Sequence, residues 1–133
     1  MDRVSTPTLM RDRSENTQVA LVVIVPLLFG AGVGIVLGIS AGFYWALLAV
    51  ATLAALLSGL EHGEVQEAAE RGAVAGAAFA LGILAAHELA GTDAKVSLGS
   101  VPAFLIVIDA IAGALLAALG CWLGRRRSAT RAA

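Results

Sequence analysis

Four long apolar stretches, almost free of charged side chains, constrain this chain more than any other feature. They cover residues 19–39, 43–60, 72–90 and 101–123, and short polar segments separate them. A helix that crosses the hydrocarbon core of a bilayer needs about 20 apolar residues, because each residue adds about 1.5 Å of rise. The sequence therefore predicts an all-α integral membrane protein with four transmembrane helices.

The composition agrees with a single membrane domain. Of the 133 residues, 59% are hydrophobic and 14% are charged, whereas soluble domains carry about 25% charged residues. The formal net charge of −1 gives no reason to expect a nucleic-acid partner, because such partners select strongly basic surfaces. We expect a transmembrane domain over residues 19–124, a flexible polar cytoplasmic segment over 1–18 and a basic cytoplasmic tail over 125–133.

The positions of lysine and arginine predict which side of the membrane each end occupies. Cytoplasmic flanks of membrane helices are enriched in these residues. If the N-terminus is cytoplasmic, Lys95 stands alone on the outer side, and all the arginines share the inner side: Arg3, Arg11, Arg13, Arg71, Arg125, Arg126, Arg127 and Arg131. The sequence thus predicts a plasma-membrane protein with both termini in the cytoplasm. The arginines of the tail either anchor this topology or bind anionic lipid headgroups.

The polar segment 61–71 predicts the cytoplasmic start of the third helix. Four glutamates recur in it every three residues: Glu61, Glu64, Glu67 and Glu70. Carboxylates are favoured near a helix N-terminus, and Glu67 precedes Arg71 by the four residues that suit an ion pair. We expect a solvated charged face, with docking of a cytoplasmic partner or a divalent cation as the alternative. His62 has no second histidine nearby, so we predict no metal site.

Small residues recur along one face of three of the predicted helices. Lipid supplies no hydrophobic force between helices, so small side chains let the backbones approach closely. The expected helix-packing positions are Gly30, Gly34 and Gly38 in the first helix, Gly72 and Gly76 in the third, and Gly113, Ala117 and Gly120 in the fourth. We expect the glycine face of the first helix to point outward and form an oligomer. We also expect a kink at Pro26 and an N-cap at Ser100.

Asp109 is the one acidic or basic side chain deep inside a predicted span. Placing an aspartate near the middle of a membrane helix costs about 2.5–3.5 kcal/mol. Such residues normally face other helices and mark functional sites. Counting residues from the outer ends of the helices puts Thr52 level with Asp109. The same counting puts His87 several ångströms further out, within reach of a bridging water.

Asp109 has two competing interpretations. In the structural one, it bonds to Thr52 and holds two helices together. In the functional one, it binds a proton or a cation, and His87, Glu88 and Tyr44 form a polar vestibule outside it. Cys121, near the inner boundary, is expected to be a small packing residue.

Three functional hypotheses follow from these features. The first is a structural or accessory membrane protein that acts through helix contacts with itself or with a larger membrane complex. The second is a small transporter or channel that moves protons or cations by means of Asp109, and the third is a holin-like pore former. Short loops leave little room for a substrate site, so we predict no enzyme and no cofactor.

Overall fold

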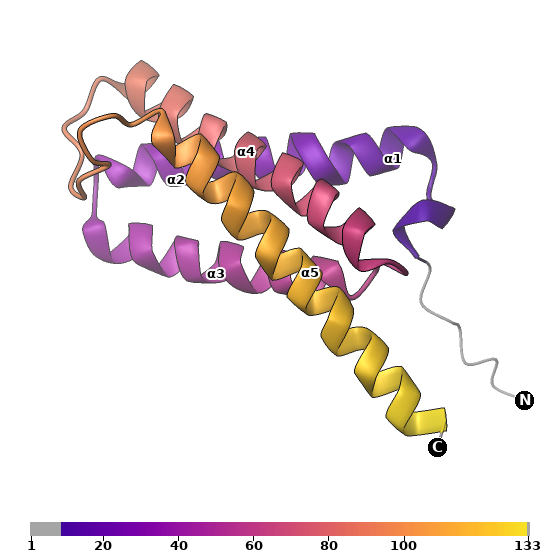
Figure 1. The fold of residues 1–133 in the computed structure, drawn as a ribbon. Coiled ribbons are helices and arrows are strands. Elements are labelled where there is room, and N and C mark those ends of the chain that lie inside the picture. Colours follow the sequence, from indigo (N-terminus) through magenta and orange to yellow (C-terminus); the bar gives the residue numbers. More distant parts are fainter. Residues whose placement is uncertain (1–8, 133) are drawn as a thin grey trace, which may run out of the picture.

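The computed structural model describes residues 9–132, which form a bundle of long helices (Figure 1). Within this range there is no β-strand, and four helices are long and apolar enough to cross a membrane. They are Glu15–Leu37, Ala41–Gly59, Val65–Ala90 and Phe104–Ala132. The prediction of an all-helical chain with four helices long and apolar enough to cross a membrane is confirmed.

The first long helix is built from three consecutive elements, α1 (Glu15–Val19), η2 (Ala20–Ile24) and α2 (Val25–Leu37). η2 is a π-helical segment, and it ends two residues before Pro26. Proline has no N–H, and in a regular α-helix its ring clashes with the carbonyl four residues earlier. A π-helical turn changes the register of the hydrogen bonds at that point. The structure thus has a π-helical segment just before Pro26, and the predicted kink stays a prediction.

α3 (Ala41–Gly59) follows a turn that ends at Ser40, whose hydroxyl accepts a hydrogen bond from the Phe43 N–H at 3.4 Å. α4 (Val65–Ala90) begins after a turn formed by residues 60–64, so Glu61 precedes the third helix instead of starting it. The helix ends at Gly91, whose φ of 61° is the left-handed conformation that glycine adopts without strain.

α5 (Phe104–Ala132) begins three residues later than expected. Residues 102 and 103 form a turn in which the Phe104 N–H donates to the Val101 carbonyl at 3.0 Å. The predicted N-cap at Ser100 is therefore wrong. At its other end α5 continues without a break to Ala132, so the expected basic tail is the last part of this helix.

Close backbone contacts fix the order in which the helices pack. α2 packs on α4, α4 on α5, and α5 on α3, and α5 crosses the bundle obliquely (Figure 1). A Cβ added at any glycine of these contacts would overlap the neighbouring backbone: Gly30 meets Phe79, Gly34 meets Ile83, Gly72 meets Gly113, Gly76 meets Asp109, Gly59 meets Ala117, and Gly120 meets Leu56.

The expectation that the glycine face of the first helix points outward is wrong. Gly30 and Gly34 are buried against α4, and Gly38 lies against Thr92 of the loop that follows α4. This face is therefore used inside one chain. It offers no surface to a second copy.

The start of the described chain folds onto the turn between α3 and α4. η1 (Met10–Asp12) is held there because the Met10 N–H donates to the Glu61 carbonyl at 3.0 Å and Arg13 pairs with the Glu61 carboxylate at 2.9 Å. Residues 9–18, which we expected to be flexible, are thus folded against the bundle. Arg3 lies outside the described residues.

Arg71 links the first helix to α4. Its guanidinium donates to the Gln18 side chain at 2.7 Å and pairs with Glu67 at 3.0 Å. The ion pair between Glu67 and Arg71 predicted from their spacing is confirmed.

Candidate functional site around Asp109

Asp109 lies in the second turn of α5, where this helix crosses α4. Gly76 permits the crossing, because any side chain there would overlap the backbone of Asp109. The Asp109 side chain is partly buried, and its Oδ2 atom is buried with no hydrogen-bond partner in the described structure. An acceptor buried without a partner costs about 1–3 kcal/mol.

Tyr44 is the polar side chain that the fold places near Asp109. It is only 3% exposed and belongs to an apolar cluster with Val33, Leu37 and Ile83. Leu105, about one helical turn before Asp109 in α5, packs against this cluster. A phenol can donate a hydrogen bond to a carboxylate and accept one from a carboxylic acid, but within residues 9–132 the Oδ2 atom of Asp109 has no partner.

The structure does not bring Thr52 to Asp109. Thr52 is exposed on the outside of α3, and its hydroxyl donates to the Leu48 carbonyl of the same helix at 2.9 Å. Depth along the helix was not enough to predict a contact, because α3 turns a different face toward α5. The structural interpretation, in which Asp109 bonds to Thr52, therefore lacks its proposed partner.

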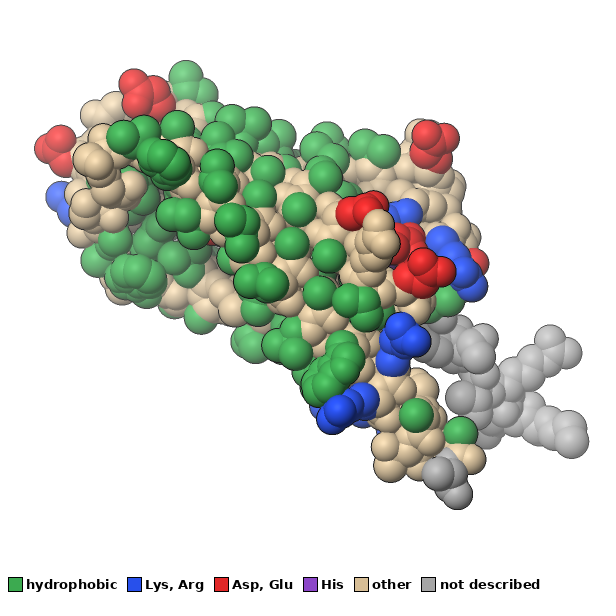
Figure 2. Space-filling view, in the orientation of Figure 1, with side chains coloured by type: hydrophobic (Ala, Val, Ile, Leu, Met, Phe, Trp, Pro, Cys, Tyr) green, Lys and Arg blue, Asp and Glu red, His purple; other side chains and the backbone are tan. Residues whose placement is uncertain are grey.

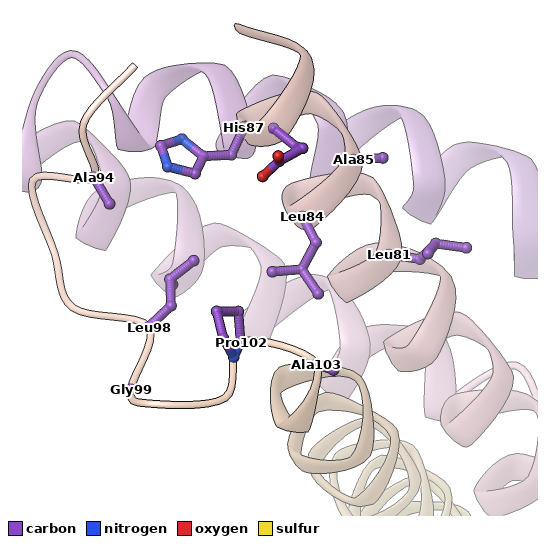
Figure 3. Close-up of a pocket in the computed structure, with 10 residues that line it drawn as sticks. Leu81, Leu84, Ala85, His87, Ala94, Leu98, Gly99, Pro102 and Ala103 are labelled. Atoms are coloured by element: carbon purple, nitrogen blue, oxygen red, sulfur yellow. The ribbon is translucent and has the colours of Figure 1, made fainter. Parts of the chain in front are cut away.

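His87 lies on a groove between the end of α4 and the loop that leads into α5 (Figure 3). The groove has a volume of about 610 Å³, and its walls are formed by Leu81, Leu84, Ala85, His87, Glu88, Ala94, Leu98, Gly99, Pro102 and Ala103. The Nδ1 atom of His87 is buried without a partner, whereas Glu88 is exposed. The groove is therefore mostly apolar, with two ionisable groups at its edge.

His87 is too far from Asp109 for a single bridging water. Gly76 is level with Asp109, and His87 lies eleven residues further along α4, which is about 16 Å at 1.5 Å per residue. A water that bonds to both groups spans about 6 Å, twice a hydrogen-bond length. The predicted bridge is therefore wrong. The prediction assumed that the end of α4 and the start of α5 lie at the same position along the bundle.

A second group of buried polar atoms, which the sequence did not reveal, lies at the opposite end of the bundle. His62 is 6% exposed, and its Nε2 atom has no partner in the described structure. Cys121, which is 1% exposed, donates its S–H to the His62 carbonyl at 3.3 Å. His62 stands in a polar turn, so no sequence signal indicated that it would be buried.

Over residues 9–132 no group of three or more His, Cys, Asp and Glu side chains could hold a metal ion. The candidate site therefore consists of Asp109 and Tyr44 inside the bundle, with the groove at the end where α4 finishes. No protein-family model matches the chain, and no curated protein or solved structure is significantly similar to it.

Proposed function

We propose that this chain is a multi-pass protein of the plasma membrane that takes up protons at Asp109 and carries them across the bilayer. The observation that supports this most directly is the buried Oδ2 atom of Asp109, which has no hydrogen-bond partner among the described residues. Ionisable groups within spanning helices are costly, and where they persist they mark proton or ion pathways.

A proton suits this site better than a metal ion does. Hard cations such as Mg²⁺ and Ca²⁺ take about six or more oxygen ligands, and over residues 9–132 no group of three or more His, Cys, Asp and Glu side chains lies together. A proton needs only the carboxylate itself.

The same proposal places both termini in the cytoplasm. Both described ends of the chain lie at one end of the bundle (Figure 1), together with the turn that Met10 and Arg13 contact. Lys95 lies at the opposite end, where its N–H donates to the Leu37 carbonyl. The positive-inside bias then assigns the arginine-bearing end to the cytoplasm.

The groove beside His87 provides the outer entrance in this scheme. It reaches Ala103, six residues before Asp109, which is about 9 Å along α5. Glu88 and the imidazole of His87 stand at its edge and can exchange protons with water.

A structural or accessory role is the second candidate. It is supported by the apolar exterior of the bundle, where large side chains such as Leu28, Phe43, Leu53 and Leu115 are at least 60% exposed. Such a surface fits lipid or the helices of a larger membrane complex. Self-association through the first helix is no longer part of this candidate, because Gly30 and Gly34 are already buried.

Proton flux into liposomes tests the proposal. Purified protein is reconstituted into liposomes that contain a pH-sensitive dye, and a pH gradient is applied with valinomycin and potassium present to balance charge. We expect the wild-type chain to dissipate the gradient and Asp109→Asn to reduce the rate to that of empty liposomes, because an amide cannot take up the proton.

Asp93→Asn is the matched control, since Asp93 is an exposed carboxylate in the outer loop and its loss should leave the flux unchanged. Equal flux from wild type and Asp109→Asn would contradict the proposal. No flux from either protein, together with co-purification of a second membrane protein, would favour the accessory role.

A further inference from the structure

The last part of α5 projects from the bundle and carries a concentrated positive charge. At Gly124 the helix is still close to the bundle, because an added Cβ would lie 3.2 Å from the Leu60 side chain. From residue 125 to residue 132 every side chain is exposed, and this end of the helix diverges from the others (Figure 1). It bears Arg125, Arg126, Arg127 and Arg131, which we call the arginine end; basic side chains are visible on it in Figure 2.

Within residues 9–132 no acidic side chain pairs with these arginines, because the two ion pairs found there involve Arg13 and Arg71. The arginine end also adds no acid of its own. Its charge is therefore available to an anionic partner.

One face of α5 shows where this charge lies relative to the lipid. Leu115, Leu119, Trp122 and Arg126 are spaced so that they fall within about 60° of one another on the helix, and Leu115 and Trp122 are 66% and 42% exposed. The Arg126 guanidinium lies 4.0 Å from the centre of the Trp122 ring. Leucine, then tryptophan, then arginine is the order of the hydrocarbon core, the interface and the headgroup region.

We infer that the arginine end binds the phosphate groups of anionic phospholipids in the cytoplasmic leaflet. This inference rests on the membrane insertion and orientation proposed above, and it does not depend on proton transport. Guanidinium groups match phosphate oxygens with paired hydrogen bonds. Consecutive arginines point in directions about 100° apart around the helix, so Arg125, Arg126 and Arg127 reach different lipid molecules around α5.

The position of the arginine end favours lipid over a soluble acidic protein or a nucleic acid. The arginines begin one residue after Gly124, which still lies close to Leu60, and Trp122 lies less than one helical turn before them. α5 runs obliquely to the other helices (Figure 1), so the projecting residues leave the bundle at an angle to its long axis.

Quenching of tryptophan by brominated lipids tests this inference, since bromine quenches fluorescence on contact. The chain has two tryptophans, so Trp45→Phe leaves Trp122 as the only reporter. This variant is reconstituted into phosphatidylcholine bilayers that contain increasing fractions of brominated phosphatidylglycerol or, separately, brominated phosphatidylcholine. We expect Trp122 to prefer the anionic lipid on the order of fivefold, the factor expected from one arginine at an anionic surface.

Trp122→Phe provides the matched control, because it leaves Trp45, which is 58% exposed near the start of α3 at the opposite end of the bundle. Trp45 should show no preference between the two lipids. In the Trp45→Phe background, changing the four arginines of the arginine end to glutamine should abolish the preference, so that the two lipids quench Trp122 in a ratio of about 1. These side chains are exposed, so the fold should be unaffected.

A preference at Trp122 that persists in the glutamine variant, or the absence of any preference in the wild-type arginine end, would overturn the inference. The proposed membrane insertion fails in a different way: brominated phosphatidylcholine would then quench neither tryptophan. Competition by a soluble acidic peptide or by RNA, with no preference among lipids, would assign the arginine end to that other partner and would also overturn the inference.

Discussion

The environment of the Asp109 side chain distinguishes a structural role from a functional one. A carboxyl group that holds helices together needs a partner, and Thr52 turns away from it to its own helix. What remains is a buried oxygen that has no partner within residues 9–132. A group in this situation destabilises the fold, so its presence is better explained by function than by stability.

This argument predicts that Asp109→Leu stabilises the protein. Removing an unsatisfied buried acceptor should raise the free energy of unfolding by about 1–3 kcal/mol, and leucine is favoured in a membrane helix. Thermal unfolding in detergent, followed by circular dichroism, measures the change. A lower melting temperature would mean that Asp109 has a stabilising partner, and the structural interpretation would return.

The helices are held together by backbone contact at small residues. Gly34 of α2 lies against the backbone of Ile83 in α4, whereas Gly32 of the same helix is exposed with nothing within 4 Å of an added Cβ. The two glycines have the same chemistry and lie half a turn apart. They therefore separate the effect of packing from the effect of helix propensity.

We predict opposite effects of alanine at these two positions. Gly34→Ala should lower the free energy of unfolding by about 1–3 kcal/mol, because α2 and α4 must move apart to admit the methyl group. Gly32→Ala should raise it by about 0.5–1 kcal/mol, because alanine favours the helix. Chemical unfolding in detergent compares the two variants. Equal effects would mean that Gly34 does not lie in a helix contact.

At the scale of the whole molecule, the order of packing places both described ends of the chain together (Figure 1). The loop after α4 lies at the opposite end, tied to the end of α2 by the hydrogen bond from Lys95 to Leu37. Exposed sites are available at both ends, Ala94 in the outer loop and Ala129 in the arginine end. The single native cysteine, Cys121, is 1% exposed and should not react in the folded protein.

This arrangement predicts the outcome of cysteine labelling in intact cells. A membrane-impermeant maleimide should label Ala94→Cys, which faces outward in the proposed orientation, and should label Ala129→Cys only after the membrane is permeabilised. The wild-type chain serves as the control for Cys121. Labelling of Ala129→Cys in intact cells would contradict the cytoplasmic location of the C-terminus.

The sequence by itself determined the number of apolar helices, their approximate extents and the ion pair between Glu67 and Arg71. These features depend on the length of an apolar run or on neighbours within one helical turn, both of which can be counted along the chain. The sequence also identified Asp109 as exceptional, because a charge within a span is visible without any knowledge of the fold.

Only the tertiary structure decided which faces meet. Periodicity identifies a face of small residues, but it does not say whether that face meets another helix of the same chain or a second copy. Gly34 was therefore correctly predicted to pack against a helix, but the predicted partner was wrong. The partners of Asp109 depend on where helices cross and how far each extends, and this excluded Thr52 and His87. Burial of His62 beside Cys121 likewise results from a turn closing over α5, a contact between residues far apart in the chain.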